Sequence, residues 1–323
     1  MMLRLFDNAQ YNVMRHWRAA VIVTSVFVIP GLALFGVHGL NTSIEFTGGT
    51  LIQVHANDPA INTAGIRAAL GAAGITGAEI QTFGAPDEFV IRARLDPRSE
   101  QTDATTQETR DAVRDALNGA FSPEAFEVDR AEAVSPKVSG ELRERATLAL
   151  LLGLGATFLV LWFRYEWRFG LAAVIATVHD VIATVAFVSY LNLEISLVVV
   201  AALLTLIGYS LNDTIVTFDR VRENVKRSKR QDYFYDILNR SINETLPRTV
   251  LTSGTTLSAV LALLILGGSV IRPFAWVMAF GIVVGTFSSI FIASPVLLWV
   301  ERRWPSEDVK VVKGAGMSAP APA

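Results

Sequence analysis

Six stretches of the chain are almost continuously apolar and are long enough to cross a lipid bilayer. They are residues 19–40, 146–163, 170–190, 195–217, 249–268 and 274–299. A helix needs about 20 apolar residues to span the hydrocarbon core of a membrane. The pattern therefore predicts six transmembrane helices.

The first apolar stretch, residues 19–40, follows a short segment that carries Arg4, Arg15 and Arg18. Signal-peptide cores contain only about 7–15 apolar residues, and this stretch is longer. No small-residue cleavage site follows it convincingly. We therefore expect a retained first membrane helix, with a cleaved signal as the alternative.

Residues 41–144 have a different character, because strand and helix patterns alternate there. Asp58 before Pro59 predicts the start of one helix, and Thr105 with Glu108 forms a capping box that predicts the start of another. Short runs rich in β-branched and aromatic residues predict strands at 50–56, 79–83, 88–95 and 126–134. The order β-α-β-β-α-β is that of a ferredoxin-like α+β domain. That topology hosts many functions, so it does not indicate a role by itself.

Composition agrees with a membrane protein. The 323 residues are 51% hydrophobic and 18% charged, whereas soluble domains carry about 25% charged residues. The absence of cysteine excludes disulfides, thiolate metal sites and cysteine nucleophiles. A net charge of −2 suggests no nucleic-acid partner.

The distribution of Lys and Arg predicts the orientation. If segment 1–18 is cytoplasmic, the segments on its side of the membrane hold 17 of the 28 Lys and Arg residues, and the short loops on the other side hold only Arg272. Cytoplasmic loops are enriched in these residues. We therefore expect cytoplasmic termini, and an extracytoplasmic domain at 41–144 with a net charge of −8.

Two predicted cytoplasmic segments remain. Loop 218–248 is basic, and it carries Tyr233, Phe234, Ile237 and Leu238 at helical spacing. This pattern predicts a surface helix on the inner leaflet, with the basic cluster near anionic lipid; a regulatory or partner site is the alternative. We expect segment 300–323, which ends in alternating Ala and Pro, to be a disordered tail.

Two carboxylates interrupt the apolar stretches. Asp213 lies toward the cytoplasmic end of 195–217, and Asp180 lies near the centre of 170–190. An ionisable group at membrane depth is costly and usually marks a proton or ion path. The alternative is a satisfied polar contact between packed helices. At about 100° per residue, the helical face of Asp213 also carries Leu206, Tyr209, Ser210, Thr217 and Arg220.

Arg248 opens the fifth apolar stretch from the cytoplasmic side. A nearby cation favours the ionised form of a carboxylate, whereas burial favours the protonated form. Asp213 could therefore release a proton when Arg248 approaches and take one up when Arg248 withdraws. Alternatively, Arg248 merely extends its charged end to the inner surface. His179 is rotated about 100° from Asp180 on the helix, so the two need not act together.

An intramembrane aspartyl protease with Asp180 and Asp213 as its dyad is the enzyme hypothesis. The residues before Asp213 are Ser-Leu-Asn rather than the Gly-x-Gly that such proteases show, and Asp180 follows His179 rather than Tyr. The chain has no spacing typical of a catalytic triad, a phosphate-binding loop or a metal site. We therefore predict a protein that is not an enzyme, holds no metal or cofactor, and draws energy from a gradient or a partner.

Three stretches resemble the SecF family of the SecD–SecF protein-export complex. They are Glu45–Thr50, Gly208–Arg220 and Leu246–Ser253, with Pro247 where many relatives have Ser. The matching motif residues are Phe46, Thr47, Gly48, Gly49, Gly208, Tyr209, Asn212, Thr214, Asp219 and Arg220.

The resemblance implies a multi-pass protein of the inner membrane, which forms the six-helix half of a resistance-nodulation-division (RND) type transporter and is completed by a separate SecD chain. It implies that the complex uses the proton-motive force to help draw preproteins from the SecYEG translocon, with YajC and membrane lipids as further partners. It also implies that Asp213, Arg248 and Asp180 relay protons.

Two other functions remain open at this point. A half-transporter of the same superfamily could export a small molecule or lipid, but about 100 residues of outer domain leave little room for a large pocket. A passive assembly subunit would have no proton path of its own, and Asp213 would then be dispensable.

Overall fold

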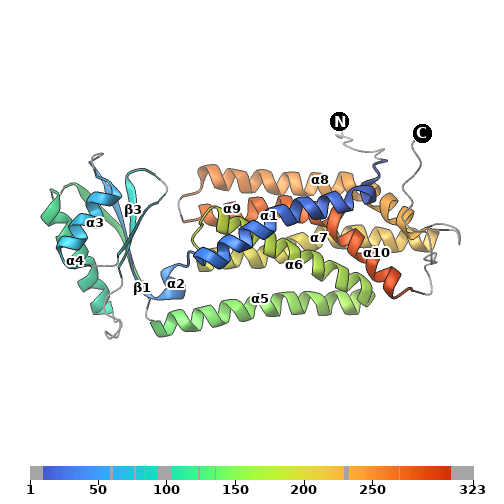
Figure 1. The fold of residues 1–323 in the computed structure, drawn as a ribbon, viewed down its shortest axis with the longest axis horizontal. Coiled ribbons are helices and arrows are strands. Elements are labelled where there is room, and N and C mark those ends of the chain that lie inside the picture. The colour runs from blue at the N-terminus through green and yellow to red at the C-terminus, as the bar shows by residue number, and fades with distance from the viewer. Residues whose placement is uncertain are drawn as a thin grey trace.

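The apolar stretches form helices that run lengthwise beside one another, and a small sheet domain lies beyond one end of them (Figure 1). The computed structural model describes residues 10–306 apart from 59–60, 76–77, 84, 94–102, 123, 135, 229–232 and 269. Within these residues, six helices are long and apolar enough to cross a membrane. The predicted six-helix fold with an inserted α+β domain is confirmed.

The membrane helices are often longer than the apolar stretches that predict them. They are α1 (Trp17–His38, after the short turn η1, Val13–His16), α5 (Pro136–Arg164), α6 (Trp167–Tyr190), α7 (Leu197–Arg227), α8 (Phe234–Leu266), α9 (Arg272–Ser288) and α10 (Ser294–Arg303), with the π-turn η2 (Ser289–Ala293) between the last two. About half of each of α6, α7 and the α9–α10 span is buried, whereas α1, α5 and α8 lie mostly at the surface. The buried helices thus form the centre of the bundle.

The sheet domain has the predicted β-α-β-β-α-β order. Its strands are β1 (Gly49–Ala56), β2 (Glu79–Thr82), β3 (Glu88–Ala93) and β4 (Phe126–Val134), and they pair antiparallel in the order β2-β3-β1-β4. Helices α3 (Thr63–Ala72) and α4 (Asp103–Ala120) cover the face away from the membrane bundle (Figure 1). Ile52 and Ile91 from the sheet, with Ile66 and Val113 from the helices, are fully buried between them.

Both predicted helix starts in this domain are wrong. Helix α3 is capped by Asn62, whose side chain accepts a hydrogen bond from the Gly65 backbone N–H at 2.9 Å. The Asp58 carbonyl instead accepts a hydrogen bond from the Ile61 N–H, and the Ile61 side chain is buried in the core. Helix α4 begins at Asp103, so Thr105 lies inside it. Local capping signals place a helix end only to within a few residues.

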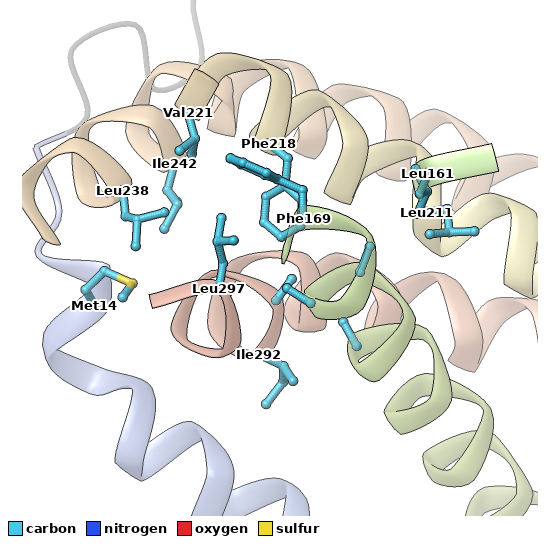
Figure 2. Packing of buried hydrophobic residues seen from close by; sticks show 14 of the residues in the cluster. Met14, Leu161, Phe169, Leu211, Phe218, Val221, Leu238, Ile242, Ile292 and Leu297 are labelled. Carbon is cyan, nitrogen blue, oxygen red and sulfur yellow. The ribbon is translucent and has the colours of Figure 1, made fainter. Parts of the chain in front are cut away.

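The predicted surface helix near residue 234 is also wrong. Helix α8 is continuous from Phe234 to Leu266, and Phe234, Ile237 and Leu238 are buried. They pack against α7, α10 and the turn before α1, and Figure 2 shows Leu238 beside Met14. Apolar spacing alone cannot distinguish a face that meets lipid from one that meets other helices.

The predicted disordered segment 300–323 begins with ordered structure, because α10 extends to Arg303. The Arg168 side chain donates hydrogen bonds to the carbonyls of Trp304 and Pro305, at 2.8 and 3.3 Å, and so ties the chain after α10 to α6. Residues 307–323 lie outside the described part of the chain.

A glycine on α1 allows a close approach to α6. A Cβ atom added at Gly31 would lie 2.6 Å from the Ala186 Cβ and 3.0 Å from its Cα, whereas one at Gly36 would meet nothing within 4 Å. We expect Gly31→Ala to destabilise the protein by about 1–3 kcal/mol, because overpacked contacts must separate the helices. Gly36→Ala on the same helix is the matched control and should be neutral or stabilising. Thermal unfolding in detergent measures both, and equal stabilities would contradict the contact.

Candidate functional site

The two membrane carboxylates are buried on neighbouring helices at the centre of the bundle. Asp180 on α6 is 0% exposed and Asp213 on α7 is 3% exposed. The face of α7 that carries Leu206, Ser210, Asp213 and Thr217 packs inward along its length. Helical periodicity thus brings these polar side chains to the contacts of α7 with α6, α8 and α9.

Asp180 is enclosed by polar groups from its own helix and from α7. The Ser210 hydroxyl donates to Asp180 Oδ2 at 2.5 Å, and His179 Nδ1 lies 2.9 Å from Oδ1. The two side chains therefore meet, although their positions on the helix are about 100° apart. Angles on a helical wheel describe Cβ directions, and the imidazole ring is long enough to reach back to the neighbouring carboxylate. His179 Nε2 is buried without a hydrogen-bond partner among the described residues.

Asp213 joins three helices. The Ser253 hydroxyl on α8 donates to Asp213 Oδ2 at 3.1 Å, and Thr286 on α9 donates to Ser253 at 2.7 Å. The Asn212 amide adds a longer contact to Oδ1, at 3.4 Å. The carboxylate is therefore held by uncharged donors on α7 and α8, and Thr286 on α9 is linked to it through Ser253.

The structure does not pair Arg248 directly with Asp213. Arg248 is exposed, and no ion pair within 4.0 Å joins it to Asp213 in the described structure. Arg248 lies on α8 between one and two helical turns before Ser253, which contacts Asp213. Arg248 thus lies near the site, but its guanidinium is outside the polar contacts that enclose Asp213.

A line of polar side chains continues between α7 and α8 toward the end of the bundle opposite the sheet domain. Thr217 and Thr245 are buried with their hydroxyl oxygens 3.4 Å apart. Beyond them, Asn224 donates to Ser241 at 3.0 Å and to Glu244 at 2.7 Å. Glu244 also accepts from Arg220 Nε at 2.6 Å. Polar contacts thus extend along the α7–α8 interface from Asp213 to Asn224.

The motif residues around Asp213 have diverse positions. Gly208 and Asn212 face outward, whereas the Tyr209 hydroxyl is buried with no hydrogen-bond partner among the described residues. Thr214 donates to the Ser210 carbonyl at 3.3 Å, and Asp219 lies 3.8 Å from Arg222.

The motif at Phe46–Gly49 lies at the opposite end of α7, in and after the short helix α2 (Ile44–Thr47). Phe46 is buried, and the Thr47 hydroxyl donates to the Ser43 carbonyl at 3.1 Å. Gly48 and Gly49 have φ values of 72° and 126°. Residues that carry a side chain rarely adopt these backbone conformations, so the turn into β1 requires glycine at both positions.

Sequence reasoning identified both carboxylates but missed the groups that hold Asp213. Ser253 and Thr286 come from helices distant in sequence, and their signal is only a hydroxyl inside an apolar stretch. Such hydroxyls are common, because Ser and Thr usually bond to their own helix, as Thr255 does to the Leu251 carbonyl at 3.0 Å. Only the packing of α7, α8 and α9 distinguishes a hydroxyl that bonds to another helix from one that bonds only within its own helix.

Two known protein families match this chain. A family described as "Protein export membrane protein SecD/SecF, C-terminal" matches residues 112–303, and a second, "SecD/SecF GG Motif", matches residues 33–60. A protein translocase subunit SecF from Gemmatimonas aurantiaca is 52% identical, over 95% of this chain and 92% of its own length. SecF from Vibrio alginolyticus is 42% identical, over 87% of each chain.

Solved structures agree with these matches. The crystal structure of SecDF, a translocon-associated membrane protein from Thermus thermophilus, superposes with a TM-score of 0.81 at 37% identity, over 94% of this chain. A second SecDF structure, in a super-membrane-facing form, gives a TM-score of 0.64 at 39% identity, over 92% of this chain. The present chain spans only 40% and 39% of those SecDF chains.

The contact between Ser210 and Asp180 should contribute to stability. Ser210→Ala removes a hydroxyl from a buried carboxylate, and we expect a loss of about 0.5–2 kcal/mol, the range found for polar contacts inside membrane proteins. Thr205→Ala on the same helix is the control, because the Thr205 hydroxyl bonds only to its own helix, at the Ala201 carbonyl. Thermal unfolding in detergent compares the two variants. Equal effects would show that the Ser210 contact is not stabilising.

Proposed function

This chain belongs to the SecF family, and from this premise we propose that it works with SecD as a proton-driven subunit that assists preprotein translocation. It is a transport protein and not an enzyme. The SecF relatives and the SecDF structures named above all carry protein-export descriptions, and none describes an exporter of small molecules or lipids.

The observation that carries the proposal is the set of partners around Asp213. A hydroxyl can donate to an ionised carboxylate and can accept a hydrogen bond from a protonated one. Ser253, which is supported from behind by Thr286, therefore suits both forms of Asp213, whereas a permanent ion pair would hold it ionised. A carboxylate that is satisfied in both forms can take up and release a proton without leaving a buried group unpaired.

Arg248 has the position of a mobile regulator in this proposal. When its guanidinium moves toward Asp213, the ionised carboxylate is favoured and the proton leaves. When it returns to its exposed position, the protonated form is favoured.

Asp180 shares the site through Ser210, which lies one helical turn before Asp213 on α7. We assign Asp180 to the same proton site.

SecD is the proposed partner across the outward face of α7 and α8. Thr205, Gly208 and Asn212 lie on one exposed side of α7, and Thr255 and Ser258 are exposed on α8. Small and polar residues at membrane depth are typical of helix–helix contacts and unfavourable against lipid. The SecYEG translocon, YajC and the preprotein are the further partners that this function implies.

The proposed orientation places the sheet domain outside the cytoplasm. In Figure 1 the beginning of α1 and the end of α10 lie at the end of the bundle opposite the sheet domain. The ion pairs of Arg168, Arg220 and Arg227 gather at helix ends that the positive-inside pattern assigns to the cytoplasm. The polar line below Asp213 then leads to the cytoplasmic surface.

Asp213→Asn tests the proposal, because it removes the titrating group while keeping the size and one acceptor oxygen. We expect the variant to insert and bind SecD normally but to lose the part of preprotein translocation into membrane vesicles that an uncoupler abolishes. Asp236→Asn, at an exposed position on α8, makes the same chemical change away from the site and should behave as wild type. An Asp213→Asn variant that stays fully active and uncoupler-sensitive would refute the proposed relay.

A further inference from the structure

The sheet domain is joined to the membrane bundle by two chain connections, and neither of them reaches α7. The chain enters the domain from α1 through α2, and leaves it from β4 into α5. Helices α1 and α5 are the least buried of the bundle. Any direct link between the domain and the helix that carries Asp213 must therefore be noncovalent.

The first such link caps the outer end of α7. The Leu197 N–H, at the first position of the helix, donates to Glu45 Oε2 at 2.5 Å, and the Ser43 hydroxyl donates to the same oxygen at 3.2 Å. Ser196, which occupies the N-cap position, makes no side-chain capping bond. The free N–H groups and positive dipole end of a helix favour a carboxylate there. Here that carboxylate comes from the segment that enters the domain.

The second link is a short backbone pairing beside the cap. Thr42 and Ile195 form a parallel bridge, in which the Ser43 N–H donates to the Ile195 carbonyl at 3.0 Å and the Ile195 N–H donates to the Asn41 carbonyl at 2.7 Å. The loop before α7 and the segment before α2 are therefore fixed to each other by both backbone and side-chain bonds.

The third link is an ion pair between the sheet and the same loop. Arg92 on β3, an inner strand of the sheet, lies with Nη2 2.5 Å from Glu194 Oε2. The side chains are 8% and 20% exposed, so water screens the pair weakly. Arg92 Nη1 also reaches Asn41 at 3.5 Å.

Beside these contacts lies a polar cavity of about 390 Å³, lined in part by Asn41, Gly48 and Arg92. The junction thus depends on a few polar bonds beside an open space.

We propose that Glu45, Arg92 and Glu194 form an outer latch that transmits movement of α7 to the extracytoplasmic domain. The proposal rests on the proposed proton-driven function and identifies the residues that convert it into movement of the domain. Helix α7 is continuous from Leu197 to Arg227, so a shift of α7 at Asp213 moves its outer end as well. Asp213 lies about 24 Å from that end, at about 1.5 Å per residue. The latch transmits this shift to the segment Glu45–Thr50 through Glu45, and to the sheet through Arg92.

The test uses the complete complex with SecD in membrane vesicles, and it measures both preprotein export and proton flux. The variants are Glu45→Ala, Glu45→Gln, Arg92→Glu, Glu194→Arg, and the double swap that exchanges Arg92 and Glu194. In the Ala variant and the two single charge variants, we expect export to fall several-fold, to the level that an uncoupler leaves in wild type, while proton flux remains. Glu45→Gln should retain most export, because its side-chain oxygen can still accept from Leu197, and the swap should restore export.

The control is Arg130→Glu, which breaks an exposed ion pair with Glu132 in the same sheet and should leave export unchanged. The latch is refuted if the single variants export as well as wild type. It is also refuted if they lose proton flux and SecD binding together with export and the swap restores none of them, because that pattern indicates a purely structural contact. A wild-type complex without proton flux would refute the proposed function itself, so the two failures remain distinct.

Discussion

Burial of a carboxylate at membrane depth is the constraint on which the centre of this structure depends. Asp180 and Asp213 are both buried inside the bundle, so each needs polar partners from neighbouring helices. Ser210 supplies one for Asp180, and Ser253 supplies one for Asp213. These contacts join α6, α7 and α8, and Thr286 adds α9 through Ser253, so the bundle is held together around its two buried carboxylates.

Helix α7 connects the features that matter for function. Its middle carries Ser210 and Asp213, the end away from the sheet domain is tied to α8 through Arg220, Asn224 and Glu244, and the end beside the sheet domain is capped by Glu45. One continuous helix thus contacts the buried carboxylates, the polar line that follows them and the segment that enters the sheet domain. The motif segments Glu45–Thr50 and Gly208–Arg220 are therefore connected through one helix, the first by the cap at its end.

The sequence was informative where a pattern is local and repeated. The apolar stretches predict six spans because hydropathy and length determine insertion, and the alternation in residues 41–144 predicts the order of strands and helices in the domain. It was less informative about what each face meets. Phe234, Ile237 and Leu238 pack against other helices rather than lipid, and Asn62 rather than Asp58 caps α3. Ser253, His179 and Glu45 could not be assigned, because their partners depend on tertiary packing or on side-chain reach.

Whether Asp213 exchanges a proton is the central question, and infrared difference spectroscopy of the SecD-bound protein in lipid addresses it directly. On acidification we expect the carbonyl stretch of buried, protonated carboxyl groups to appear, and we expect the component from Asp213 to be missing in Asp213→Asn but present in Asp236→Asn. A spectrum without such a band, or a band that is unchanged in Asp213→Asn, would contradict the account.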